Sequence, residues 1–226
     1  MDPLRLLLAD DHPLFRTALR VVLDGLGAPL QITEAATFSA LVEAAADSAE
    51  LDLILLDLTM PGAMGLSSLV YLRSERPAVP VIVVSANDHP RTIRRTQQFG
   101  AAGFVSKSAL PQEMLEATRS VLDGGEWFPA TEADRSDADA QLATRLAQLT
   151  PQQLRVLMCV AEGLLNKQIA YELGIAENTV KVHVTAILRK LECNSRTQLA
   201  VLVKGLAATV QEAEGSGGVA DQQLLD

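Results

Sequence analysis

Apolar and polar positions follow a repeating pattern through the first half of the chain, where short apolar runs alternate with segments of helical spacing. The apolar run at 53–56 is unbroken and ends at one acidic residue, Asp57. Such a run is typical of a strand buried on both faces of a parallel sheet. The alternation predicts a doubly wound α/β fold, a five-stranded parallel sheet with helices on both faces. The expected strands are 4–9, 32–35, 53–56, 79–85 and 103–107, and the expected helices are 13–26, 38–46, 66–72, a largely polar one at 91–99, and 111–122.

Polar side chains stand where four of these strands end. Asp10 and Asp11 follow the first strand and Asp57 follows the third, while Ser85 and Lys107 end the fourth and fifth. Right-handed crossovers place the carboxyl ends of parallel strands at one edge of the sheet, so we expect these side chains to meet there. Open α/β sheets bind their ligands at that edge. Taken singly, each residue has a plainer use, since an aspartate often closes a turn or caps a helix.

The predicted cluster has the chemistry of a phosphoryl-transfer site. Carboxylates held close together repel one another, and a hard divalent cation relieves that repulsion. Mg²⁺ prefers oxygen ligands and often completes its octahedron with phosphate oxygens. A carboxylate beside the cation can attack a phosphoryl donor, while a lysine and a hydroxyl bind the phosphoryl oxygens.

Residues 1–123 resemble the receiver domain of two-component response regulators. The matching residues are Asp10, Asp11, Asp57 with Met60, Pro61 and Gly62, Ser85, and Lys107. The resemblance implies strand order 2-1-3-4-5 and a histidine kinase that phosphorylates Asp57. Its implied Mg²⁺ ligands are Asp10, Asp11, Asp57 and the backbone carbonyl of Thr59. Ser85 and Lys107 would serve the phosphoryl group.

Phe104 lies three residues before Lys107 and matches the aromatic position whose rotamer couples to Ser85 when receivers are activated. Many receivers carry a tyrosine there. Phenylalanine has no hydroxyl to donate, which puts the polar part of that switch in question. The alternative is that Phe104 is an apolar strand residue with no further role.

Charge is unevenly distributed along a chain whose net charge is −9. Residues 1–126 carry −6, residues 127–148 carry −2, residues 149–207 carry +3 and residues 208–226 carry −4. One basic segment in an acidic protein indicates that this segment meets a polyanion. We expect residues 124–148 to form a linker with a short helix through Leu142, Leu146 and Leu149. Residues 208–226 read as an acidic, disordered tail.

The basic segment 149–207 has the apolar spacing of four short helices. Two of them, 166–173 and 177–191, are joined by a turn that begins at Gly174, which is the arrangement of a helix-turn-helix. A polar strip runs along the second of these helices, opposite its apolar face. The strip consists of Asn178, Val182, Thr185 and Arg189, with Lys181 and Lys190 at its edges. Such a face suits the major groove of DNA, although an ordinary solvated helix shows the same pattern.

Residues 149–207 resemble the LuxR-type helix-turn-helix, and with the receiver they have the architecture of NarL-type response regulators. The matching segments are 149–151, Gly163, 166–170, 179–181, 183–184, Leu188, 190–191 and 195–197. The resemblance implies a transcriptional regulator, not an enzyme, that binds double-stranded DNA as a homodimer when active. RNA polymerase is a further candidate partner. The expected DNA-binding residues are Lys167, Asn178, Thr179, Lys181, Val182, Thr185, Arg189 and Lys190. Ala176 departs from the pattern, which usually has a serine N-cap there.

Other features favour a cytoplasmic protein with no membrane segment. No apolar run reaches spanning length, residues 1–3 open no signal peptide, and Cys159 and Cys193 are too few for a disulfide framework. Two rival functions remain open. A receiver can act unphosphorylated as an interaction module, and Mg²⁺-dependent phosphatases of the haloacid-dehalogenase type also use strand-end aspartates. Those phosphatases usually place a second aspartate two residues after the nucleophile, where this chain has Thr59.

Overall fold

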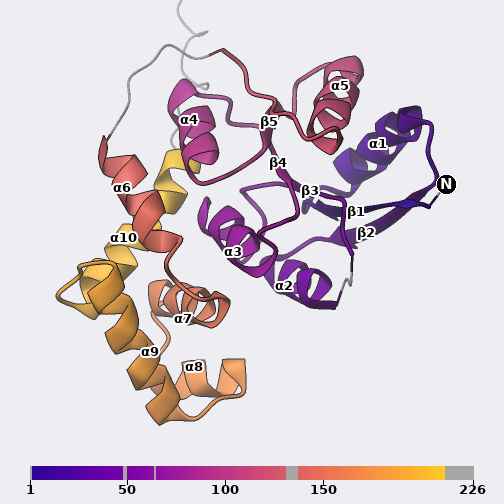
Figure 1. Cartoon of the computed structure of the whole chain (residues 1–226). Coiled ribbons are helices and arrows are strands. Elements are labelled where there is room, and N and C mark those ends of the chain that lie inside the picture. The colour runs from indigo at the N-terminus through magenta and orange to yellow at the C-terminus, as the bar shows by residue number, and fades with distance from the viewer. Residues whose placement is uncertain (1, 48–49, 64, 131–136, 212–226) are drawn as a thin grey trace, which may run out of the picture.

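The computed structural model describes residues 2–47, 50–63, 65–130 and 137–211, in which a sheet-containing half is followed by a helical half (Figure 1). The sheet half holds a five-stranded parallel sheet in the order β2-β1-β3-β4-β5, which confirms the predicted order. Its strands are β1 (Leu4–Ala9), β2 (Leu30–Ala35), β3 (Leu53–Leu56), β4 (Val81–Ser85) and β5 (Gly103–Ser106). All neighbouring pairs are parallel, so the carboxyl ends of the strands lie at one edge.

Helices cover both faces of this sheet. The helices α1 (Pro13–Leu23) and α5 (Pro111–Leu122) lie on one face, and α2 (Phe38–Asp47), α3 (Ser67–Glu75) and α4 (Pro90–Gln98) lie on the other (Figure 1). Successive strand residues alternate between two hydrophobic clusters, so that Leu6 packs with α1 and α5 while Leu7 packs with the other layer. Every residue of β3 is buried, which accounts for its unbroken apolar sequence.

Several expected boundaries differ from the structure by one to three residues, among them those of the first helix and of two strands. The helix predicted at 13–26 ends as α1 at Leu23 and continues as a 3₁₀ turn, η1 (Asp24–Leu26), which Gly27 closes at φ 75°. The strand predicted from residue 79 begins at Val81, because a proline at position 80 has no N–H for the strand ladder. The second strand begins at Leu30 instead of residue 32.

The helical half contains α6 (Asp137–Leu146), α7 (Pro151–Ala161), α8 (Asn166–Leu173), α9 (Glu177–Lys190) and α10 (Arg196–Gln211). A capping box of Thr150 and Gln153 starts α7, and Gly174 at φ 63° ends α8, so α8 and α9 form the expected helix-turn-helix. The helix α10 continues to Gln211, past residue 208 where the tail was expected to begin, and the remainder of that tail lies outside the described residues. None of the helices described has the length and apolarity needed to cross a membrane.

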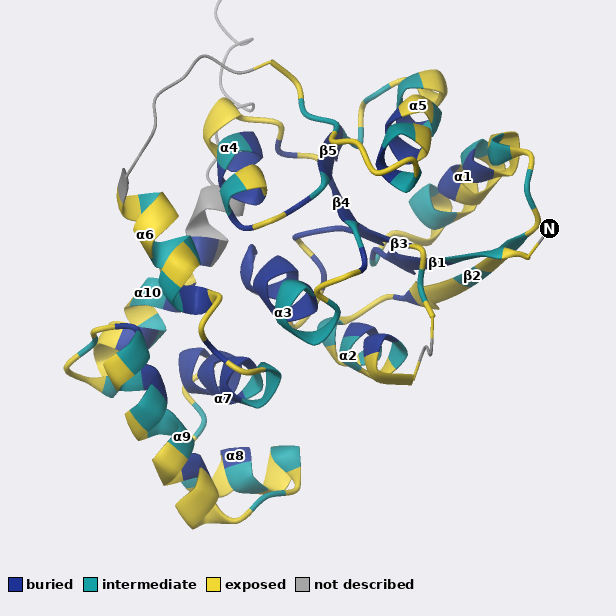
Figure 2. Cartoon of the chain, viewed as in Figure 1, coloured by how far each residue is buried: buried dark blue, intermediate teal, exposed yellow. Residues whose placement is uncertain are grey.

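The two halves pack against each other. The helices α7 and α10 contact α3, and α6 and α10 contact α4 (Figure 1). The Ser74 hydroxyl of α3 donates to the Leu149 carbonyl at 3.2 Å. One hydrophobic cluster runs from Leu72 of α3 to Leu154 of α7 and on into the helical half. Figure 2 shows α3 and α7 largely buried where they meet, whereas much of α8 and the first turns of α9 are exposed.

Candidate phosphorylation site and nucleic-acid interface

Asp57 and Asp10 directly follow the strands β3 and β1, and the sheet holds the backbone of both. The Asp57 N–H donates to the Ala9 carbonyl at 2.7 Å, and the Asp10 N–H donates to the Ala35 carbonyl at 3.0 Å. Asp57 is 1% exposed and Asp10 is 4% exposed. Two carboxylates this deeply buried and this close together require a compensating positive charge.

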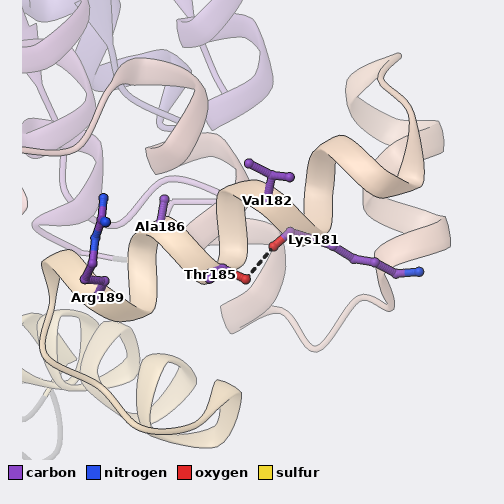
Figure 3. A pocket seen from close by; sticks show the side chains of 5 residues that line it. All are labelled: Lys181, Val182, Thr185, Ala186 and Arg189. Carbon is purple, nitrogen blue, oxygen red and sulfur yellow. Dashed lines mark hydrogen bonds between the residues drawn. The ribbon is translucent and has the colours of Figure 1, made fainter.

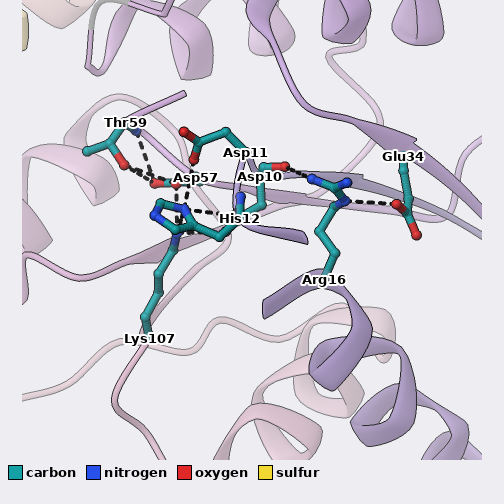
Figure 4. Close-up of polar contacts among 8 residues, drawn as sticks. All are labelled: Asp10, Asp11, His12, Arg16, Glu34, Asp57, Thr59 and Lys107. Carbon is teal, nitrogen blue, oxygen red and sulfur yellow. Dashed lines mark hydrogen bonds and ion pairs between the residues drawn. The ribbon is translucent and has the colours of Figure 1, made fainter. Parts of the chain in front are cut away.

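Lys107 brings that charge from the end of β5 (Figure 4). Its Nζ lies 2.7 Å from Asp10 Oδ2 and 2.7 Å from Asp57 Oδ2. Burial acts to lower the pKa of Lys107, but its contacts with the two carboxylates outweigh burial and hold the pKa above its ordinary value. The Lys107 N–H donates to the Ser85 carbonyl at 2.8 Å, so the end of β4 positions this lysine.

Thr59 holds the Asp57 carboxylate from the turn that follows β3. Its N–H donates to Asp57 Oδ1 at 3.0 Å, and its hydroxyl lies 2.9 Å from Oδ1 and 3.0 Å from Oδ2. From the sequence we expected only the backbone carbonyl of Thr59 to take part. A threonine two residues after an aspartate is a common turn pattern, and that spacing was the available signal for the side-chain contact.

Ser85 and Phe104 lie behind the charged groups, in the interior of the sheet half. Ser85 is fully buried, and its Oγ accepts a hydrogen bond from the Asn87 N–H at 3.1 Å. Phe104 is fully buried on β5, opposite Val83 in the strand register. Among the described residues no hydrogen bond joins Ser85 to Asp57. The structure therefore brings Lys107 to the carboxylates and connects Ser85 to them only through the Lys107 backbone.

A pair of arginines on α1 supports the site from the side, and the sequence had not suggested them. Arg16 Nη1 donates to the Asp10 carbonyl, and Arg16 Nε donates to Glu34 of β2 at 2.8 Å (Figure 4). Arg20 donates to the other oxygen of Glu34. Hydrogen bonds from Arg16, then from Arg20, hold the pKa of Glu34 below its ordinary value. The backbone of Asp10 is thus tied to both α1 and β2.

The donor atoms at this edge fit a hard divalent cation. One ligand atom from each of Asp10, Asp11, His12 and Asp57 lies within 4.8 Å of the others. Asp10 Oδ2 and Asp11 Oδ1 are buried oxygens that face nitrogens: Lys107 Nζ lies 2.7 Å from the first and His12 Nδ1 lies 2.8 Å from the second. Three carboxylates with oxygens of this kind suit Mg²⁺. His12 was not among our expected site residues, although its place directly after the aspartate pair was visible in the sequence.

The second helix of the helix-turn-helix presents the expected polar strip to solvent. Val180 and Ile187 are buried on the opposite side of α9, where they belong to the core. Figure 3 shows an open hollow along the outer face, lined by Lys181, Val182, Thr185, Ala186 and Arg189. The Thr185 hydroxyl donates to the Lys181 carbonyl at 2.9 Å, within the helix. The expected contacts that are exposed are Lys167, Asn178, Thr179, Lys181, Val182, Thr185 and Arg189.

Lys190 differs from the other expected DNA contacts because its ammonium turns into the protein. It is half-buried, and Nζ donates to the Gln148 carbonyl at 2.8 Å and to Gln153 Oε1 at 2.7 Å. The helical wheel placed Lys190 at the edge of the polar strip, but it contained no information about the segment before α7. The geometry favours a structural role for this lysine.

A parallel sheet with this acidic edge, followed by a helix-turn-helix with an open second helix, defines a DNA-binding response regulator. The chain belongs to this family. The response regulator receiver domain matches residues 6–119, and the luxR family of bacterial regulatory proteins matches residues 147–203. As a member of this family the protein is a DNA-binding transcription regulator and not an enzyme, so the phosphatase alternative is set aside.

Similar proteins share nearly the whole length of the chain. It is 41% identical over 211 residues to the glycerol metabolism activator of Pseudomonas putida, covering 89% of this chain and 95% of that protein. It is 34% identical over 207 residues to the nitrate/nitrite response regulator NarL of Escherichia coli K12, with the same coverage. The solved structure of the RcsB response regulator from Salmonella typhimurium has the same fold, with a TM-score of 0.53, 21% identity, and coverage of 91% of this chain and 100% of RcsB.

Proposed function

We propose that Asp57 accepts a phosphoryl group from the phosphohistidine of a histidine kinase. A carboxylate oxygen of Asp57 attacks phosphorus, and the new P–O bond forms as the P–N bond to the kinase histidine breaks. The observation that carries this proposal is the Lys107 ammonium, 2.7 Å from Asp57 Oδ2. It is placed to neutralise charge on the transferred group, which is the largest contribution a protein makes to phosphoryl transfer.

Mg²⁺ bound by Asp10, Asp11, Asp57 and the Thr59 carbonyl would supply further positive charge to the phosphoryl oxygens. Thr59 orients the Asp57 carboxylate through the hydrogen bonds described above. Ser85 ends β4 and would offer its hydroxyl to a phosphoryl oxygen. Phe104 is the aromatic residue whose packing would change when Ser85 binds that oxygen. Because Phe104 has no hydroxyl, its part in the switch is confined to packing.

Communication with the helical half runs through Arg95 of α4. This arginine is 5% exposed, and its Nε lies 3.3 Å from Asp139 Oδ1 of α6. Its Nη1 donates to the Gly205 carbonyl of α10 at 3.4 Å, and its guanidinium lies 5.8 Å from the centre of the Phe99 ring. One side chain of the receiver therefore contacts both the linker helix and the last helix of the output domain.

Phosphorylation is proposed to act as a population shift that loosens this contact. The helix α4 follows the strand that ends in Ser85, so a rearrangement at the phosphoryl group reaches Arg95 over a short segment. The state with α4 held against α6 and α10 would dominate before phosphorylation, and its opening would allow the output domain to pair with a second copy. A DNA-bound homodimer, as in the solved structure of two RcsB dimers on two DNAs, is the expected active form.

In the active form α9 is proposed to enter the major groove of double-stranded DNA. Asn178, Val182, Thr185 and Arg189 would reach base edges, while Lys167, Thr179 and Lys181 would hold phosphates. Lys190 is not included among the proposed DNA contacts, because its ammonium donates hydrogen bonds to Gln148 and Gln153. RNA polymerase is a candidate partner of the DNA-bound dimer, and the cytoplasm is the compartment in which kinase and DNA are both accessible.

Mass spectrometry tests the central proposal. The purified protein is incubated with Mg²⁺ and a small phosphodonor, and the phosphorylated peptide is identified. Label is expected on Asp57, and none is expected in Asp57→Ala. The matched control Asp123→Ala, at the exposed end of α5, should be labelled like the wild type. Label that persists in Asp57→Ala would refute the assignment, and a wild type that takes up no label would favour the receiver that works unphosphorylated.

A further inference from the structure

The His12 side chain lies against the carboxylates at the sheet edge, although a residue at this position would ordinarily cap α1. It is the N-cap residue of α1, where serine, threonine, asparagine or aspartate usually caps the helix through its side chain. The His12 side chain forms no such capping hydrogen bond with the described residues. Its Nδ1 lies 2.8 Å from Asp11 Oδ1 and 3.3 Å from Asp10 Oδ1 (Figure 4).

These separations are those of neighbouring ligands around one metal ion. In an octahedral site with ligand distances of about 2.1 Å, adjacent ligand atoms are about 3 Å apart. The same atoms already surround a positive charge, because Lys107 Nζ lies 3.4 Å from His12 Nδ1 and 2.7 Å from Asp10 Oδ2. His12 Nδ1 therefore stands beside the oxygen donors and near the same cation.

The backbone of His12 is fixed in this position. Its N–H donates to Asp10 Oδ1 at 2.7 Å, and the following residue is Pro13. A residue before proline is restricted to extended conformations, and His12 has φ −91° and ψ 102°. Binding through the imidazole would consequently order only two side-chain torsions, which keeps the entropic cost of recruiting this ligand small.

We propose that His12 Nδ1 is an additional metal ligand of this pocket, which gives the receiver an enhanced affinity for borderline divalent cations such as Co²⁺ and Zn²⁺. Imidazole suits these cations, whereas Mg²⁺ is bound through carboxylates, carbonyls and water. A neutral imidazole with its proton on Nε2 leaves the Nδ1 lone pair available. The inference rests on the proposed phosphorylation pocket and adds to it one ligand and a class of metal.

Equilibrium dialysis of the full-length protein against Co²⁺ and against Mg²⁺ tests the inference. The Co²⁺ affinity of His12→Ala is expected to fall at least about tenfold, since even groups that only support a metal ligand cost 10–100-fold when removed. The Mg²⁺ affinity is expected to stay close to that of the wild type. His12→Asn should lose Co²⁺ affinity in the same way although asparagine caps helices well, which separates metal binding from the start of α1. His183→Ala on α9 is the matched control and should leave both affinities unchanged.

Electron spin echo measurements on the Cu²⁺-loaded protein give a direct signature, because Cu²⁺ is a borderline cation that suits imidazole ligands. Modulation from a coordinated nitrogen is expected in the wild type and in His183→Ala, and its loss is expected in His12→Ala. An unchanged Co²⁺ affinity in both His12 variants, or a wild-type echo without nitrogen modulation, would overturn the inference and leave the oxygen site intact. A wild type that binds neither metal would overturn the proposed pocket as well, so the two failures are distinguishable.

Discussion

Lys190 at the end of α9 donates a hydrogen bond to Gln153 in the first turn of α7, with 2.7 Å between Nζ and Oε1. The same Oε1 accepts a hydrogen bond from the Thr150 N–H at 3.1 Å, as part of the capping box. The ammonium also donates to the Gln148 carbonyl at 2.8 Å. The Lys190 ammonium at the carboxyl end of α9 therefore holds the amino end of α7. At the carboxyl end of α9 it also complements the dipole of that helix.

Replacing Lys190 by alanine should lower the stability of the output domain and leave the electrostatics of DNA binding unchanged. The expected loss is about 1–2 kcal/mol in the free energy of unfolding, since the ammonium makes charged hydrogen bonds in a half-buried place. Urea unfolding measures this loss, with the exposed Lys204→Ala as the control. If Lys190→Ala keeps its stability and the slope of log affinity against log salt becomes shallower, Lys190 is a phosphate ligand after all.

Lys181 and Arg189 should make different contributions to DNA binding. Lys181 is exposed and pairs with Glu177 at 3.1 Å, so its alanine variant should weaken binding to all sequences and reduce the salt slope by about one unit. Arg189→Ala should cost roughly 1–3 kcal/mol at one base position if the guanidinium reads a guanine. Binding curves at several salt concentrations, on specific and on scrambled DNA, distinguish the two roles. A uniform loss in both variants would reduce Arg189 to a phosphate contact.

Breaking the ion pair between Arg95 and Asp139 should activate the unphosphorylated protein. With typical coupling energies of about 1–3 kcal/mol, Asp139→Ala is expected to raise DNA affinity without phosphodonor about 5- to 150-fold. The exposed Arg91→Ala on the same helix is the control. The double variant Arg95→Asp with Asp139→Arg restores opposite charges and should return part of the inhibition. Equal affinities for Asp139→Ala and the wild type would show that this contact does not regulate binding.

Tyr71 should make the receiver sensitive to alkaline pH. Burial, and then the charge of Glu75, raises the pKa of Tyr71 to about 12 from an ordinary value of 10.0. The pKa of Tyr71 is higher in the folded than in the unfolded protein, so the protonated phenol stabilises the fold. This contribution to the free energy of unfolding is complete below about pH 10 and is lost as the pH rises through about 12. Tyr71→Phe keeps the edge-on contact with Phe38, whose ring centre lies 5.5 Å away. Urea unfolding between about pH 9 and pH 11.5 should show a smaller loss of stability in Tyr71→Phe than in the wild type or in the exposed Tyr171→Phe.

The sheet and its acidic edge were predictable from the sequence because both depend on short segments. An unbroken apolar run such as 53–56 indicates a central strand, and crossover handedness then brings Asp10, Asp57 and Lys107 to one edge. The side chains of Arg16 and Thr59 were missed because their roles depend on exact directions at the site, which residue order does not contain.

The contacts between the two halves were not predictable for a different reason. The helix α4 reads as polar, yet Thr92, Arg95 and Thr96 on it are buried. A polar helix face predicts exposure to solvent unless another domain covers it. No pattern within residues 91–99 predicts that α6 and α10 contact this helix. Lys190 is a similar case, because its acceptors belong to a segment far away in the sequence.

Because a hydrophobic cluster continues from α3 into α7, the equilibrium between packed and separated halves should depend on temperature. Separating the halves would expose apolar side chains to water, which gives the opening a positive heat capacity change. Apolar attachment weakens on cooling, while the ion pair of Arg95 depends on temperature through the hydration of its charges. The free energy needed to separate the two halves would therefore change with growth temperature. The same degree of phosphorylation would then produce a different promoter response at different temperatures, because of this interface.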